Sequence, residues 1–126
     1  GIRDCLLSRG LGPDAATASL CINYGGRDEI VHAARRFAAD CVQGLKQPEE
    51  LTECDFAHYL FTDGIPDPEL IIRPSGEIRT SNFLLWQSAY AEYYFTDVLW
   101  PDFDEQELDK AIASYRTRER RFGGRK

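Results

Sequence analysis

Short apolar runs that end at glycine, arginine or proline recur along the chain and predict buried strands. Residues 19–24 form the first run, which is β-prone and stops at two glycines. Residues 70–72 form the second run, and the sequence Arg-Pro-Ser-Gly follows it. Residues 98–100, which precede a proline, are a third candidate. The pattern therefore predicts three strands.

Apolar residues recur at helical spacing soon after the first predicted strand. The positions that fall on one face of a 3.6-residue spiral are Ile30, Ala33, Ala34, Phe37, Ala38 and Cys41. Gly44 and Pro48 are residues that typically close a helix. The spacing therefore predicts an amphipathic helix that ends before Gly44, with this face toward the core.

Capping patterns and apolar stripes predict three further helices. Thr52, with Asp55 three residues later, is typical of the start of a short helix through about residue 59. Residues 82–90 carry one apolar stripe and are expected to be helical. Asp104 and Glu107 form a second capping pattern before a C-terminal helix. The core-facing positions of that helix are Leu108, Ala111, Ile112 and Tyr115.

Strands that alternate with helices predict an α/β fold, in which helices flank a parallel sheet. Three strands are few for a sheet that is covered on both faces. We therefore expect residues 1–126 to form a single domain that is the C-terminal portion of a longer catalytic domain. The sequence contains no apolar run long enough to cross a bilayer and no leader that resembles a signal peptide, so we expect a cytoplasmic protein.

Charge and cysteine content narrow the classes of function. The net charge of −6 makes nucleic acid a poor partner. The four cysteines include no pair at metal-binding spacing, so neither a zinc site nor a disulfide framework is expected. Basic residues nevertheless gather near the C-terminus, where 6 of the 15 lie in the last eleven positions. This segment is either a solvated tail or part of an anion site.

The residues that follow the second predicted strand are suited to binding an anion. Arg73 and Arg79 flank a Ser-Gly turn, and Ser81 lies at the start of the helix expected at 82–90. Two guanidinium groups, a hydroxyl and the amides of a helix N-terminus together match the charge and the acceptors of a diphosphate. The alternative is that the arginines form surface ion pairs with Glu69 or Glu77 while Ser81 caps the helix.

Glu92 lies in an aromatic segment, Tyr-Ala-Glu-Tyr-Tyr-Phe. A carboxylate in apolar surroundings is costly unless it is paired or bound to a cation. One interpretation is an ion pair with a nearby arginine. The other is a ligand for Mg²⁺, which often takes one or two carboxylates and completes its coordination with water and substrate phosphate.

Several motifs, in their order along the chain, closely resemble the C-terminal part of bacterial undecaprenyl diphosphate synthases, which are cis-prenyltransferases. The resemblance covers about residues 20–124. The motifs are Asn-Tyr-Gly-Gly-Arg at 23–27, Arg-Pro-Ser-Gly-Glu at 73–77, Ser-Asn-Phe-Leu-Leu-Trp-Gln at 81–87, Ala-Tyr-Ala-Glu at 89–92, Phe-Thr-Asp-Val-Leu-Trp-Pro-Asp-Phe at 95–103 and Arg-Glu-Arg-Arg-Phe-Gly-Gly at 118–124.

The resemblance implies a transferase that adds isopentenyl diphosphate units, with cis geometry, to an allylic diphosphate such as farnesyl diphosphate. The implied cofactor is Mg²⁺. The implied product is an undecaprenyl-type polyprenyl diphosphate, a carrier lipid for cell-wall synthesis. The resemblance also implies a homodimer and a peripheral membrane contact through the lipid product.

The resemblance assigns roles to individual residues of this chain. The residues that would bind the diphosphate of isopentenyl diphosphate are Arg73, Arg79, Thr80 and Ser81. Glu92 corresponds to the C-terminal magnesium ligand of the family. Arg121 and Gly123, in the closing Arg-x-Gly motif, would contact the diphosphate of the partner subunit across the dimer interface.

The sequence departs from the family pattern at two points. Pro74 stands where threonine is more usual, and a proline at this position stiffens the turn. The family's Asp-Gly-Asn-Gly-Arg-Trp segment, which carries the principal catalytic aspartate, has no counterpart in this sequence. No catalytic residue is therefore assigned within residues 1–126, and we expect this chain by itself to be inactive.

Two other hypotheses use the same residues. A non-catalytic partner subunit, or a truncated fragment, would bind isopentenyl diphosphate without turnover. A small α/β anion-binding module would account for the two arginines but not for the order of the motifs. The mass of the intact protein and the upstream coding sequence would distinguish an enzyme of this family from a non-catalytic partner subunit.

Overall fold

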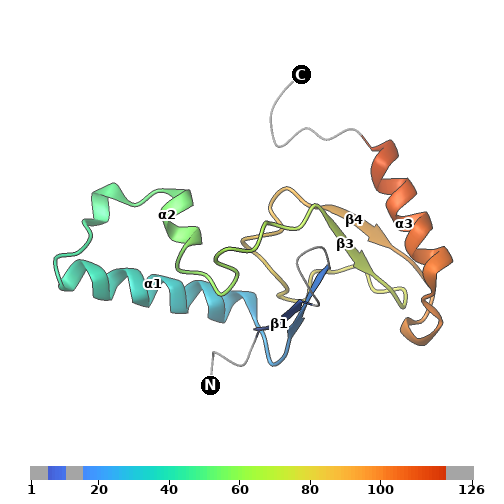
Figure 1. Cartoon of the computed structure of the whole chain (residues 1–126), viewed down its shortest axis with the longest axis horizontal. Helices are drawn as coiled ribbons and strands as arrows, with labels where there is room; N and C mark the ends of the chain where they lie inside the picture. The colour runs from blue at the N-terminus through green and yellow to red at the C-terminus, as the bar shows by residue number, and fades with distance from the viewer. Residues whose placement is uncertain (1–5, 11–15, 119–126) are drawn as a thin grey trace. The chain divides into compact units, whose positions relative to one another are not determined.

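The computed structural model describes residues 6–10 and 16–118 and shows two compact units, each of which is described by itself (Figure 1). Unit 1 is Gly1–Pro66 and unit 2 is Asp67–Lys126. Unit 1 contains β1 (Leu6–Gly10), β2 (Thr17–Cys21), α1 (Gly26–Val42), the 3₁₀ helix η2 (Pro48–Glu50) and α2 (Glu53–Ala57). Unit 2 contains β3 (Leu70–Arg73), β4 (Glu92–Phe95), the 3₁₀ helix η3 (Trp100–Asp102) and α3 (Glu105–Thr117).

The first predicted strand is part of a hairpin. β2 pairs with β1 in antiparallel register, with Leu6 opposite Cys21 and Gly10 opposite Thr17. The prediction of a buried strand at 19–24 was wrong in its burial and in its end, because four of the five residues of β2 are exposed and the strand stops at Cys21. Asn23 has a φ of 56°, so the chain leaves the extended conformation before the two glycines.

α1 confirms the predicted amphipathic helix, and its buried face agrees with the predicted one in part: Ala33 is buried, and Ile30, Phe37 and Cys41 are half-buried. The extended residue Gly25 precedes its first turn, and Gly26, Glu29 and Ala33 are its buried residues. Ala34 and Ala38, which were expected in the core, are exposed. The buried face therefore includes a carboxylate, that of Glu29, which a pattern of apolar residues cannot indicate.

Glu29 is 1% exposed and links two loops of unit 1. Its Oε1 accepts a hydrogen bond from the hydroxyl of Tyr24, and its Oε2 accepts one from the N–H of Phe61 at 2.8 Å. Because it lies in the first turn of α1, the helix dipole also favours its negative charge. Two charge-assisted hydrogen bonds and the dipole offset the cost of burying the carboxylate.

α2 confirms the first capping prediction, since the hydroxyl of Thr52 accepts a hydrogen bond from the N–H of Asp55 at 3.1 Å. The residues after α2 pack on α1 through Tyr59, whose ring meets that of Phe37 edge-on with centroids 5.8 Å apart. The hydroxyl of Tyr59 donates to Asp40 Oδ2 at 2.5 Å.

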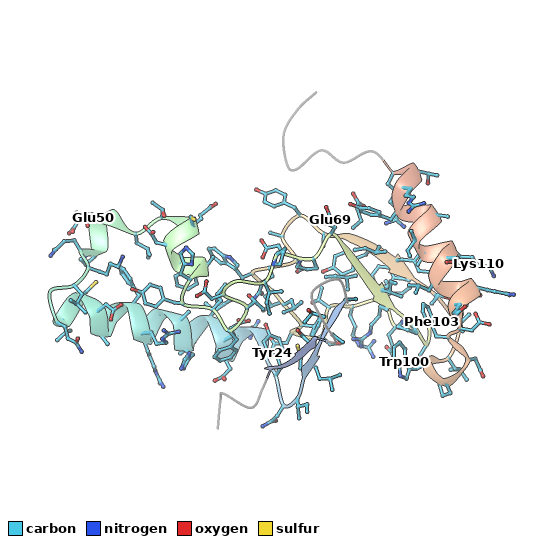
Figure 2. The ribbon with its side chains drawn as sticks, viewed as in Figure 1. Tyr24, Glu50, Glu69, Trp100, Phe103 and Lys110 are labelled. Atoms are coloured by element: carbon cyan, nitrogen blue, oxygen red, sulfur yellow. The ribbon has the colours of Figure 1, made fainter. Side chains whose placement is uncertain are left out.

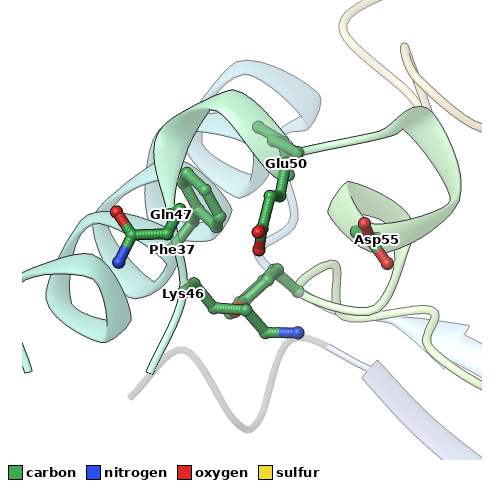
Figure 3. A pocket seen from close by; sticks show the side chains of 7 residues that line it. Phe37, Lys46, Gln47, Glu50 and Asp55 are labelled. Carbon is green, nitrogen blue, oxygen red and sulfur yellow. The ribbon is translucent and has the colours of Figure 1, made fainter. Parts of the chain in front are cut away.

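Side chains of Phe37, Lys46, Gln47, Glu50 and Asp55 line a shallow hollow of about 50 Å³ in this region (Figure 3). That volume has room for about one or two water molecules, so the hollow is too small for an organic substrate.

Unit 2 contains the parallel strand pair that defines the α/β fold. β3 and β4 run parallel, side by side, in Figure 1. Leu70 lies opposite Glu92, and Arg73 lies opposite Phe95. The strand predicted at 70–72 is confirmed. The strand predicted at 98–100 was wrong, because those residues form a bend and the start of η3. The aromatic residues at 93–95 pair with β3 instead, and Trp100 stacks on Phe103 with centroids 5.9 Å apart (Figure 2).

The helix predicted at 82–90 does not form. This segment is a series of turns, and Ser81, Asn82 and Leu84 have φ angles of 49°, 65° and 48°. A positive φ is incompatible with a right-handed helix for residues of L configuration. The helical spacing of the apolar side chains in this segment is therefore coincidental. Hydrogen bonds stabilise the turns, and one of them runs from the N–H of Ser88 to the carbonyl of Leu84 at 2.9 Å.

α3 confirms the second capping prediction and lies against β4. Asp104 Oδ1 accepts a hydrogen bond from the N–H of Glu107 at 3.0 Å. Ala111 is fully buried, as the predicted stripe requires, but Leu108, which was also expected in the core, is exposed. Arg118, whose backbone is extended, follows the last turn. No helix in the described part of the chain is long and apolar enough to span a membrane.

Candidate anion-binding site

The structure brings Arg73 and Ser81 together, as the anion-site prediction requires. Arg73 is the last residue of β3, and its Nη2 donates a hydrogen bond to Ser81 Oγ at 3.2 Å. The carboxyl ends of parallel strands are the usual place for ligands in α/β sheets. A guanidinium group and a hydroxyl group, both exposed to solvent, thus lie side by side at such an end.

The turn after Arg73 uses its own amide groups within the protein. Ser75 and Gly76 both adopt left-handed backbone conformations, with φ angles of 66° and 72°. The N–H of Ser75 donates to the carbonyl of Val98 at 2.8 Å, and the N–H of Gly76 donates to that of Thr96 at 2.9 Å. Because these donors are engaged, an anion bound here would depend on side chains rather than on the amides of the turn.

Arg79 forms the ion pair that was the alternative to anion binding. Its guanidinium pairs with the carboxylate of Glu77, and its side chain is 64% exposed. Exposed ion pairs contribute about 0–1 kcal/mol, so a diphosphate with several negative charges could replace the single carboxylate at low cost. The contact is therefore compatible with both interpretations of Arg79.

The segment around Thr80 and Ser81 is a strained turn rather than the start of a helix. The carbonyl of Thr80 accepts a hydrogen bond from the N–H of Phe83 at 3.0 Å. Ser81 and Asn82, between them, both have positive φ. The predicted contribution of a helix dipole at Ser81 was therefore wrong. Residues other than glycine in strained backbone conformations cost about 1–3 kcal/mol each and concentrate at functional sites. Here one of the two is Ser81, whose side chain Arg73 contacts.

Glu92 lies at the other end of the strand pair from Arg73. It is the first residue of β4 and pairs with Leu70, whereas Arg73 is the last residue of β3. Three residues of strand separate the two levels by about 10 Å. Glu92 Oε2 lies 3.5 Å from Nη1 of Arg118, so the ion pair that the sequence left open is observed.

Arg118 joins α3 to β4 and was not singled out by the sequence. In addition to Glu92, its Nη1 contacts the carbonyl oxygen of Tyr93, to which it donates, and its Nη2 donates to Ser114 Oγ at 3.2 Å. One guanidinium therefore holds the end of a helix and the start of a strand. No local pattern could identify it, because its partners Glu92 and Tyr93 lie about 25 positions away.

The described residues supply only part of a magnesium site. Within residues 6–10 and 16–118, no group of three His, Cys, Asp or Glu side chains is placed to hold a metal ion. Glu92 provides one carboxylate, and a guanidinium already neighbours it. These residues therefore do not by themselves fit a bound Mg²⁺. The predicted contacts of Arg121 and Gly123 lie outside the described residues.

Comparison with solved structures defines the class of protein. The chain is similar to lavandulyl diphosphate synthase from Lavandula x intermedia, solved in complex with dimethylallyl diphosphate, with a TM-score of 0.79 and 48% identity over 82% of this chain and 45% of that one. It is also similar to "a probable undecaprenyl diphosphate synthase" from Campylobacter jejuni, with a TM-score of 0.67 and 40% identity over 82% of this chain and 46% of that one. The α/β fold of these prenyltransferases is thus confirmed.

Sequence comparison identifies the family. Residues 9–123 match the prenyltransferase family described as "Putative undecaprenyl diphosphate synthase", and the chain belongs to this family. An isoprenyl transferase from Fusobacterium nucleatum is 59% identical over 88% of this chain and 45% of its own length. One from Geobacter sulfurreducens is 50% identical over 93% of this chain and 48% of its own length. The chain therefore spans about half the length of the curated relatives that it matches.

Proposed function

We propose that this chain forms the isopentenyl diphosphate site of a cis-isoprenyl transferase. The observation that carries the proposal is the contact between Arg73 and Ser81 at the carboxyl end of β3, with Arg79 in the same loop. The relatives are isoprenyl transferases, and the bound dimethylallyl diphosphate of the lavender enzyme is an allylic diphosphate. An enzyme rather than a partner subunit is favoured because a pure scaffold has no chemical need of the retained set Arg73, Arg79, Ser81 and Glu92.

In the proposed reaction, the side chains of this chain bind and orient one substrate. The guanidinium groups of Arg73 and Arg79 neutralise the diphosphate of isopentenyl diphosphate, and the hydroxyl of Ser81 donates a hydrogen bond to it. The double bond of this substrate attacks the allylic carbon of the second substrate, whose carbon–oxygen bond to diphosphate breaks. The attack leaves a positive charge on the methyl-bearing carbon of isopentenyl diphosphate, and loss of a proton from C2, the carbon between that centre and the CH2 that bears the diphosphate, forms the new double bond. Orientation of the two substrates is the main contribution that such a site can make.

The finer features of the activity are part of the proposal. These are the cis geometry of the new double bond, an undecaprenyl-type carrier lipid for cell-wall synthesis as the product, and a peripheral membrane contact through that lipid. Glu92 is proposed as one ligand of Mg²⁺, with further ligands from outside the described residues. Arg121 and Gly123 are proposed to contact the diphosphate of a second subunit in a homodimer.

Calorimetric titration of isopentenyl diphosphate into the intact protein tests the proposal. We expect Arg73→Ala to weaken binding by about tenfold to a hundredfold, since a hydrogen bond to a charged group contributes about 1.5–3 kcal/mol. Lys110→Ala is the matched control, because it removes an exposed cation of α3 from the same unit. Equal binding by Arg73→Ala and by the wild type would overturn the assignment.

A further inference from the structure

The loop that carries Arg73 is tied to residues 96–100. Thr96, directly after β4, donates its N–H to the carbonyl of Arg73 at 3.1 Å and accepts the N–H of Gly76 at 2.9 Å. The backbone of Thr96 is therefore hydrogen-bonded to both ends of the turn formed by residues 73–76. The hydroxyl of Thr96 accepts the N–H of Val98 at 3.2 Å, which stabilises the turn on the other side.

Ser75 lies at the centre of this arrangement. Its N–H donates to the carbonyl of Val98 at 2.8 Å, and its Oγ accepts the N–H of Trp100 at 3.2 Å. The oxygen of the Ser75 hydroxyl thus accepts a hydrogen bond from the segment 98–100 within the protein. Its backbone has a φ of 66°, which reverses the chain between Arg73 and the residues that lead to Ser81.

We propose that Ser75 is a positioning residue for Arg73, an inference that rests on the proposed function. The hydroxyl of Ser75 fastens the loop to the backbone of Trp100, and the left-handed backbone directs the loop back toward Ser81. Arg73 then meets the diphosphate in an orientation that is already ordered, so that binding does not have to supply the entropy of ordering it. Ser75 acts through Arg73 and does not touch the substrate.

Two substitutions in the intact protein separate the contributions of Ser75. Ser75→Gly removes the hydroxyl and relieves the strain of a positive φ, whereas Ser75→Ala removes the hydroxyl and keeps that strain. We expect the KM for isopentenyl diphosphate to rise about threefold to tenfold in Ser75→Gly, and more in Ser75→Ala, as for the loss of one hydrogen bond. The KM for the allylic diphosphate should stay within about twofold. Ser75→Asn, which tolerates positive φ and retains an acceptor, should restore most of the lost affinity.

A double-mutant cycle with Arg73→Ala distinguishes positioning from direct binding. If Ser75 acts through Arg73, Ser75→Gly should change the affinity for isopentenyl diphosphate by less than about twofold in the Arg73→Ala background. The inference would be overturned if Ser75→Gly lowered the affinity for isopentenyl diphosphate by the same factor with and without Arg73→Ala, or if it left the affinity of the otherwise wild-type protein unchanged. Wild-type protein that does not bind isopentenyl diphosphate would instead show that the proposed function itself is wrong, and the inference would fall with it.

Discussion

Glu92 and Arg118 form an ion pair, with Oε2 and Nη1 3.5 Å apart, that joins the first residue of β4 to the residue after α3. Both side chains are partly buried, at 26% and 33% exposure. The pair lies beside a backbone contact from the same guanidinium to the carbonyl of Tyr93. The residue proposed as a metal ligand is thus also part of the packing of the C-terminal helix.

Arg118→Gln is expected to lower the free energy of unfolding by about 1–3 kcal/mol, because it leaves a partly buried carboxylate without its cation and weakens the link between α3 and β4. Urea unfolding of the intact protein measures the change. Arg79→Gln serves as the control, since it breaks the exposed pair with Glu77 and should cost less than about 0.5 kcal/mol. Equal losses in the two variants would show that Arg118 contributes no more than a surface charge.

Glu29→Ala is expected to destabilise the protein by about 3 kcal/mol or more. The substitution removes the acceptor of the N–H of Phe61 and of the hydroxyl of Tyr24, and it leaves a cavity at a position that is 1% exposed. Asp28→Ala, at the exposed neighbouring position in the same helical turn, is the control and should change little. Denaturant unfolding of both variants tests this, and a small loss in Glu29→Ala would contradict the role assigned to the carboxylate.

The stability of the protein is expected to fall as the pH rises above the ordinary tyrosine range. The hydrogen bond that Tyr59 donates to Asp40, together with burial and the negative charge of Asp40, raises the pKa of Tyr59 to about 12 from an ordinary value of 10.0. The folded state therefore holds this proton more tightly than the unfolded state does. The stabilisation is complete below pH 10 and is lost as the pH rises toward 12.

Two measurements check this pH dependence. Absorbance titration near 295 nm should show that Tyr59 ionises about two pH units later than an ordinary tyrosine, so the late component should shrink by one tyrosine in Tyr59→Phe. Tyr90→Phe, which alters an exposed ring, should leave the late component in place. Thermal unfolding of Tyr59→Phe should also depend less on pH between 10 and 12.

Gly76→Ala is expected to destabilise the protein by about 1–2 kcal/mol. Its φ of 72° disfavours a side chain, and a Cβ there would lie 3.3 Å from Oδ1 of Asp97. Gly64→Ala is a matched control, because Gly64 has a φ of 84° with no atom within 4 Å of the added Cβ. The difference between the two variants in thermal unfolding reports the contact with Asp97, and a larger loss in Gly64→Ala would contradict it.

The parts of the fold that depend on neighbouring residues were predictable from the sequence. The capping hydrogen bonds of Thr52 and Asp104 join residues three positions apart, and both form as expected. The strand at β3 was predicted because a short apolar run bounded by turn residues has few alternatives. The pairing of Arg73 with Ser81 was also anticipated, since only eight positions separate the two residues along the chain.

The helices and strands that were wrongly predicted from the sequence are explained by contacts between residues that are distant along the chain. The apolar stripe at 82–90 predicted a helix, but the chain adopts turns with positive φ at Ser81, Asn82 and Leu84. The hairpin partner of β2 lies upstream of it, and the partner of β3 is the aromatic strand β4, not residues 98–100. Helical spacing and strand-like runs are local signals, whereas strand pairing depends on which distant backbone groups are free to bond.

The amino-acid sequence is enough to establish the family, because its motifs follow one another in order over residues 9–123. It also predicts the cationic loop from Arg73 to Ser81 and the locally capped helices, because each of these depends on residues that are close together along the chain. The burial of Glu29, the ion pair of Glu92 with Arg118 and the anchoring of Ser75 on Trp100 emerge only when the chain is folded. These contacts join residues that are distant in sequence or side chains whose charge predicts exposure, so their energies depend on packing that no local pattern encodes.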